Sequence, residues 1–190
     1  MRLRQTAIIL PTLLAFALAG CAPSPPENVS EQPSEPTSPA PSSVTEAPHY
    51  HAELALSGKP VASADGKEIV VTVSVTNDGP STFSSSTGLH NVNLGAHAID
   101  KSGKVVVNDL SRAAMPLIAS GATHEVSILL PVGETLGNRV ELMPVEENVG
   151  WFDQWGTKPL VVGPFEACSG TAAGKVCDES GEPLSVVSAQ

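Results

Sequence analysis

The sequence predicts an all-β domain in which two antiparallel sheets pack face to face as a sandwich. Short segments with alternating apolar and polar residues follow one another from residue 49 to residue 165, and a period of two is typical of half-buried strands. Clusters of Gly, Pro, Asn, Asp and Ser separate these segments. None of them shows the spacing of an amphipathic helix, so we expect a second sheet to cover the apolar faces.

Four of the expected strands precede residue 110. The first is residues 51–56 (HAELAL). In residues 69–77 (IVVTVSVTN), valines alternate with Thr and Ser, and the turn signal Asn-Asp-Gly-Pro follows. Residues 89–100 form the third strand, and an Asp-Lys-Ser-Gly turn separates it from the fourth, residues 104–109 (KVVVND).

Three more strands complete the expected set. Residues 124–132 (HEVSILLPV) follow an Ala-Ser-Gly turn. In residues 138–146, Val140 and Leu142 are out of phase with Glu141 and Met143, and residues 158–165 (KPLVVGPF) form the last strand. Seven short strands in about 115 residues are typical of an antiparallel, two-sheet, immunoglobulin-like sandwich.

The first twenty residues are expected to be an export signal. Arg2 and Arg4 precede a thirteen-residue apolar run that ends at Ala19, which is too short to cross a bilayer core of about 30 Å as a helix. The run leads into Leu-Ala-Gly-Cys at residues 18–21, which resembles the bacterial lipobox. The resemblance implies diacylglycerol transfer to Cys21 and cleavage before it; the alternative is an ordinary signal peptide with an incidental cysteine.

The lipobox resemblance also implies a location. A chain lipidated on Cys21 is anchored in the cell envelope, because each buried acyl CH₂ contributes about 0.8 kcal/mol and two or three chains hold stably. Ala22 stands where an aspartate commonly marks retention in the inner membrane. The outer membrane is therefore favoured if the organism is Gram-negative.

Residues 21–48 are expected to be a disordered linker between the anchor and the sandwich. The segment after Cys21 holds eight prolines and four glutamates but no Lys, Arg or aromatic residue, so it buries too little apolar surface to fold. Proline favours an extended polyproline II conformation. The sandwich is then expected over residues 49–165.

Residues 166–190 are expected to form a disulfide loop and a flexible tail. With Cys21 lipidated, Cys168 and Cys177 remain as one pair in an exported chain, and export exposes thiols to an oxidising environment. Ligation of a metal by these two cysteines is the alternative.

The charge limits the possible partners. The chain has 10 basic and 20 acidic residues; loss of Arg2 and Arg4 leaves 8 against 20, a net charge of −12. A domain with this balance is not expected to bind nucleic acid. We expect attachment to the membrane through lipid alone, and a neutral or cationic partner.

Five motifs follow one another in residues 69–163: VTVSVTNDGP, VNLGAHAIDKSGKVVVND, the segment from Arg112 through Pro116 to Gly121, VSILLP and VELMPVEENVGWF. Their order and spacing resemble the β-sandwich modules appended to bacterial polysaccharide-processing glycosyltransferases and methyltransferases. They are also similar to the sugar-binding sandwich of O-antigen transporters. The chain departs from the family pattern before Trp-Phe, where Glu-Glu-Asn-Val-Gly replaces Gln, a single Glu and Gly.

The segment VEENVGWFDQWG (residues 145–156) is the main candidate site. It contains both tryptophans among only seven aromatic residues in the chain. We expect Trp151 or Phe152 to close the end of the core, because one aromatic side chain buries about 150–250 Å². Trp155 is expected to be exposed, and with Asp153 it would make a platform for sugars. Trp155, Trp151 and the nearby acids are the expected ligand contacts.

Glu147 and Arg112 complete the candidate ligand-binding set. Glu146 and Glu147 are adjacent, so their side chains point to opposite faces of a strand and cannot form a glycosidase pair. Glu147 is retained as a ligand contact. Arg112 is expected to begin a turn, where its guanidinium either contacts a ligand or forms a buried pair with an acid such as Asp109.

A metal site is the alternative from another class. His49 and His51 share a face if they lie on a strand, and Met115 and Met143 are soft ligands. No further ligand lies at a fixed spacing, and the sequence lacks G-x-S-x-G and H-E-x-x-H.

The sequence thus predicts an envelope lipoprotein that presents a non-catalytic sandwich, without a cofactor, for binding polysaccharide or an envelope protein. The alternative is a periplasmic lipoprotein that captures copper or zinc.

Overall fold

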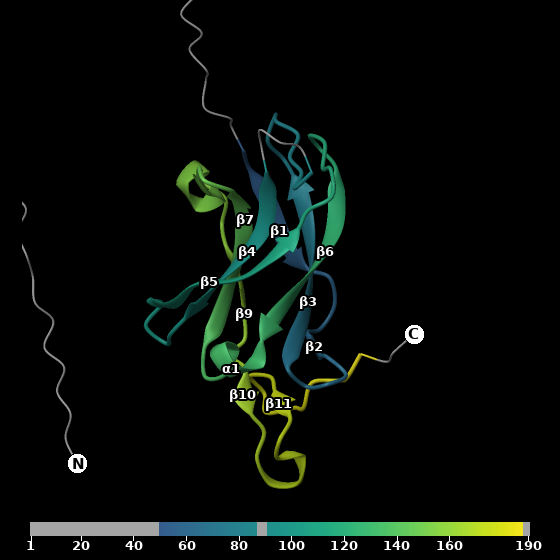
Figure 1. Ribbon diagram of the computed structural model, residues 1–190, viewed down its shortest axis with the longest axis vertical. Coiled ribbons are helices and arrows are strands. Elements are labelled where there is room, and N and C mark those ends of the chain that lie inside the picture. Colours follow the sequence, from purple (N-terminus) through teal and green to yellow (C-terminus); the bar gives the residue numbers. More distant parts are fainter. Residues whose placement is uncertain (1–49, 87–90, 188–190) are drawn as a thin grey trace, which may run out of the picture. The chain divides into compact units, whose positions relative to one another are not determined.

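The computed structural model describes residues 50–86 and 91–187. The predicted signal peptide, Cys21, the linker and His49 lie outside the described residues. The fold of the described part is an antiparallel sandwich with two facing sheets (Figure 1). The predicted all-β class is confirmed.

The first sheet is built around one long central strand, β3, which pairs antiparallel with each of the other three strands. Its strands are β1 (Ala52–Leu56), β2 (Val61–Ala62), β3 (Glu68–Asn77) and β6 (Thr123–Pro131).

The second sheet has the order β5-β4-β7-β8, and β9 also pairs with β7. Its strands are β4 (Val92–Ile99), β5 (Val105–Ala114), β7 (Arg139–Glu146), β8 (Gly150–Trp151) and β9 (Leu160–Val162). Short elements complete the domain: α1 (Val132–Thr135), the 3₁₀ helices η1 (Phe152–Trp155) and η2 (Gly170–Ala172), and the strand pair β10 (Glu166–Ala167) and β11 (Val176–Cys177).

The core lies between the two sheets, as the alternation predicts. Val71, Val73 and Val75 of β3 are fully buried, whereas Thr72 and Thr76 project outward and bond the hydroxyls of Ser127 and Thr123 on β6. Leucines and valines of β4 and β7 face them from the second sheet. Each such side chain contributes about 1.5–3 kcal/mol on burial, so the period of two accounts for the layer structure.

Strand β5 is longer than predicted. The segment expected to end at Asp109 continues to Ala114, because a register shift opposite Ala96–Ala98 of β4 lets the ladder resume. Asp109 adopts φ = 58° there, a conformation that Asp tolerates better than most residues. Arg112 is consequently in the middle of a ladder, paired with Gly95, and not at the start of a turn as expected.

The disulfide between Cys168 and Cys177 is confirmed, with Cα atoms 5.2 Å apart. The segment after it differs from the expected flexible tail as far as Val187. The amide of Ala62 donates to the carbonyl of Ser185, and the amide of Val187 donates back to the carbonyl of Ala62. These bonds attach the segment to the outer edge of β2.

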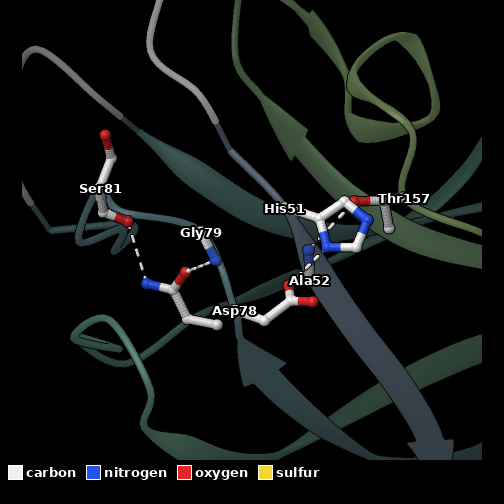
Figure 2. A network of polar contacts seen from close by, with 7 residues as sticks. His51, Ala52, Asp78, Gly79, Ser81 and Thr157 are labelled. Carbon is white, nitrogen blue, oxygen red and sulfur yellow. Dashed lines mark hydrogen bonds and ion pairs between the residues drawn. The ribbon is translucent and has the colours of Figure 1, made fainter.

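The turn after β3 is held by the buried side chain of Asn77. Its Nδ2 donates to the carbonyls of Ser81 and Ile118, at 2.9 Å each, and its Oδ1 accepts from the amide of Gly79. Figure 2 shows the neighbouring contacts, in which His51 approaches Asp78 and Thr157 accepts a hydrogen bond from the amide of Ala52. The Asn-Asp-Gly-Pro turn signal thus has a structural basis in one buried amide side chain.

Candidate functional site

Three of the predicted site residues meet on the outer face of the second sheet. The Cζ atom of Arg112 lies 4.3 Å from the centroid of the Trp151 ring. The Nε atom of Arg112 lies 3.2 Å from Oε1 of Glu147, and its Nη1 lies 3.0 Å from Oδ1 of Asp109. Neither nitrogen is aligned for a hydrogen bond, so the guanidinium is held by charge and by the ring face.

A glycine makes this arrangement possible. Gly95 lies opposite Arg112 in the β4–β5 ladder. A Cβ atom on Gly95 would lie 2.2 Å from Nη1 of Arg112 and 2.6 Å from the Trp151 ring. The two large side chains therefore rest directly on the strand backbone. A glycine inside an alternating strand often marks such a close approach, so this signal was present in the sequence.

His97 supports the ring of Trp151 from within the sheet. Its side chain is 7% exposed, and the two ring centroids are 3.8 Å apart. The amide of Asp109 donates to Nδ1 of His97 at 3.2 Å, which requires an unprotonated Nδ1. The left-handed conformation of Asp109 thus occurs where its amide reaches this imidazole.

The surroundings of His97 keep its imidazole neutral. Burial is the main cause that lowers the pKa of His97, and the positive charge of Arg112 lowers it further. The carboxylates of Asp109 and Asp153 act in the opposite direction. Asp153 is therefore close enough to act electrostatically on this group, although it is exposed on η1.

Asn93 completes the group by donating from Nδ2 to Oε1 of Glu147 at 2.8 Å. We call the following residues the outer-face cluster: Asn93, Gly95, His97, Asp109, Arg112, Glu147 and Trp151. The side chains of Asp109 and Glu147 are 54% and 30% exposed. The cluster therefore presents two fixed carboxylates to solvent beside a guanidinium and an indole.

Trp155 lies in a different environment from the one predicted. Its ring is half-buried, because it packs edge-on against Tyr50 and Phe152 with centroids 5.6 and 5.3 Å away. Phe152 is fully buried and stacks on Tyr50. Phe152, as predicted, closes the end of the core, while Trp155 does not offer the exposed platform expected of it.

The two adjacent glutamates occupy opposite sides of the second sheet, as expected. Glu146 is 3% exposed, and Glu147 contacts Arg112 on the outer face. Burial, and secondarily the charge of Glu146, raise the pKa of Tyr50 to about 12. Glu146 thus belongs to the interior of the sandwich and Glu147 to the cluster.

The predicted histidine ligands are not assembled into a metal site in the described part of the chain. His51 pairs with Asp78, with 2.6 Å between Nδ1 and Oδ1 (Figure 2). Within residues 50–86 and 91–187, no group of three or more His, Cys, Asp or Glu side chains is arranged to hold a metal ion. His49 lies outside these ranges.

Comparison with models of known protein families and with curated proteins finds no match for this chain. Among the described residues, no helix has the length and apolar character needed to cross a membrane.

Proposed function

We propose that the chain is a non-catalytic, lipid-anchored β-sandwich of the bacterial cell envelope that binds surface polysaccharide through the outer-face cluster. The observation that carries this proposal is the fixed arrangement of Asp109, Glu147 and Arg112 around Trp151. Carboxylates accept hydrogen bonds from sugar hydroxyls, and a guanidinium donates to hydroxyl and ring oxygens.

The preorganisation of the cluster supports a binding role. Gly95 and His97 hold the Trp151 ring against the sheet, and the guanidinium holds both carboxylates. A ligand would then meet side chains whose freedom is already restricted, which lowers the entropy cost of binding. The resemblance of residues 69–163 to sandwiches associated with polysaccharides points to the same ligand class.

The ligand contacts in this proposal differ from those of a flat aromatic platform. Arg112 and His97 lie against the Trp151 ring, so contact with a sugar comes from the polar rim and the exposed edge of the indole. Trp155 has no part in it, because its ring belongs to the cluster of Tyr50 and Phe152.

Binding is tested with the full-length protein in detergent micelles and with surface polysaccharide purified from the bacterium that encodes it. We expect saturable binding by isothermal titration calorimetry. Asp109→Asn and Glu147→Gln should each weaken binding about tenfold or more, because a hydrogen bond to a charged group contributes about 1.5–3 kcal/mol. Glu53→Gln is the matched control, since Glu53 is an exposed carboxylate on β1 of the other sheet. Equal binding by the unaltered chain and all three variants contradicts the assignment of the binding site to the outer-face cluster. An unaltered chain that does not bind contradicts the proposed ligand.

The anchor has its own experiment, which is independent of the ligand. Cells that express the full chain are fed radiolabelled palmitate, and their membranes are separated from the soluble fraction. We expect label on the unaltered chain and in the membrane fraction, and no label on Cys21→Ser. Incorporation that survives this substitution would place the lipid elsewhere in the chain.

A further inference from the structure

A groove of about 560 Å³ lies away from the outer-face cluster, between the end of β1, the edge strand β9 and the segment that follows the disulfide. Leu56, Val161 and Pro183 contribute apolar surface to it. Leu56 and Val161 are unusually exposed for large aliphatic side chains, at 42% and 43%. The volume lies in the range of about 300–1,000 Å³ that is usual for ligand sites, so the groove can take side chains of another molecule.

The groove is also acidic. Asp178, Glu179 and Glu182 line it against the single cation Lys59. The Asp178 carboxylate accepts hydrogen bonds within its own turn, from the amide and hydroxyl of Ser180 and from the amide of Glu182. Glu182 lies 4.0 Å from Lys59, with both side chains largely exposed, and Glu179 forms no ion pair within the described residues. An occupant with apolar and cationic side chains fits both properties.

The tip of the β4–β5 hairpin has this composition. Val105 and Val106 are 41% and 49% exposed, and Lys101 and Lys104 precede them at the turn. Neither lysine ammonium forms an ion pair in the part of the chain that the structure describes. The Asp100 carboxylate accepts three hydrogen bonds from its own turn, and the charge of Lys104 also acts on it. Both lysines are exposed at the tip, outside any ion pair of the described residues. The hairpin projects beyond the edge of its sheet (Figure 1).

We infer that the hairpin tip of one copy (Lys101–Val106) docks in the acidic groove of a second copy of this chain. Two exposed valines meet Leu56 and Val161, and two lysines meet Glu179 and Glu182. No tip residue lines the groove of its own molecule. The contact joins two different surfaces, so it either closes reciprocally in a dimer or continues from copy to copy as an open row.

Site-specific cross-linking in the envelope tests this contact on the full chain. Two differently tagged copies are expressed together, one with Val106→Cys and the other with Val161→Cys. The introduced thiols are the only free ones expected, because Cys168 and Cys177 are joined and Cys21 is proposed to carry lipid. We expect a disulfide-linked product with both tags. Thr72→Cys, on the outward face of β3, replaces Val106→Cys in the matched control pair and should give background product.

Charge reversal then tests the chemistry of the contact. Lys101→Glu together with Lys104→Glu in the Val106→Cys copy should lower the product about tenfold, because two exposed attractions become repulsions. Glu179→Lys together with Glu182→Lys in the Val161→Cys copy should restore it. The four substituted side chains, of Lys101, Lys104, Glu179 and Glu182, are all exposed. The substitutions keep the hydrogen bonds of the two turns, because Asp100 and Asp178 accept from backbone amides and serine hydroxyls.

The outcomes separate this inference from its alternatives. A cross-linked product that charge reversal removes and compensation restores supports the contact between copies. Product at the level of the Thr72→Cys control overturns it. A product between the Val106→Cys copy and another envelope protein also overturns it and assigns the tip to that protein. Polysaccharide binding is measured separately, so failure of the outer-face cluster leaves this result unaffected.

Discussion

The guanidinium of Arg112 lies over the Trp151 ring, 4.3 Å from its centroid, and both side chains rest on Gly95. One backbone position without a Cβ atom therefore determines whether the outer-face cluster can form. The contact of Arg112 and Trp151 over Gly95 should affect side-chain packing, the protonation of His97 and the stability of the fold, and each effect can be measured.

Gly95→Ala is expected to destabilise the protein. The added methyl group would lie 2.2 Å from Nη1 of Arg112 and 2.6 Å from the Trp151 ring, and overpacking of this kind costs about 1–3 kcal/mol. Urea unfolding of the full chain measures the loss. Gly133→Ala is the control, since its Cβ would meet nothing within 4 Å. Equal stability of the two variants would mean that Arg112 and Trp151 move aside freely.

Arg112→Met is expected to raise the pKa of His97. Burial is the larger cause that lowers this pKa and remains in the variant, but the repulsion by the Arg112 charge is removed. A titration of the imidazole Cε1–H resonance by NMR measures the change. Lys158→Met, at an exposed position beyond η1, should leave the resonance where it is. An unchanged His97 titration in Arg112→Met would show that the guanidinium does not act on the imidazole.

His97 also makes stability depend on pH. Because the pKa of His97 is lower in the folded protein than its ordinary value of 6.5, the unfolded chain binds more protons just below pH 6.5. The contribution of neutral His97 to stability is therefore present above pH 6.5 and is lost as the pH falls toward the folded pKa. Urea unfolding between pH 7 and about pH 5 should show a shallower loss for His97→Gln than for the unaltered chain. Parallel curves for the two proteins would contradict this role.

Two turns share the pattern Asp-x-Ser-Gly, at Asp100 and at Asp178, and the serine in each should hold the carboxylate ionised. The hydroxyl of Ser102 is the first cause that lowers the pKa of Asp100, and Ser180 acts in the same way on Asp178. Ser102→Ala should raise the pKa of Asp100 and leave that of Asp178 unchanged, and Ser180→Ala should do the reverse. Carboxyl ¹³C titration measures both groups in one experiment. Since both pKa values are lowered, the stability that these turns supply is present above the ordinary Asp value and is lost as the pH falls through the folded pKa.

Removal of the disulfide by Cys168→Ser and Cys177→Ser is expected to cost about 2.5–3 kcal/mol, the loop-closure entropy of a loop of about ten residues. The segment after Cys177 contributes Leu184 to the core and bonds Ala62, so β2 should lose protection from hydrogen exchange as well. Ser169→Ala is the control, because it lies in the loop and keeps the bond. A double variant as stable as this control would show that the backbone bonds alone hold the segment.

Much of the fold follows from local sequence. The alternation of Val71, Val73 and Val75 determines which face of β3 is buried, because successive side chains on a strand point to opposite sides. The turn signals at Asn77 and Asp100 mark where strands end, since their side chains bond nearby backbone amides. The prediction of export, together with two remaining cysteines, sufficed to predict the disulfide. These features depend on residue type and on neighbours in the chain.

The arrangement of the candidate site depends on tertiary structure. Arg112 and Trp151 are 39 positions apart in the chain. They meet over Gly95 because β4 pairs with both β5 and β7, and β7 pairs with β8, which carries Trp151. The same pairing places Asp109 beside His97, whereas Trp155 lies against Tyr50 and becomes half-buried. The periodicity of the sequence predicts on which face of a strand each side chain lies. Which side chains from other strands share that face is decided by sheet order and register, and these follow from the packing of the whole sandwich.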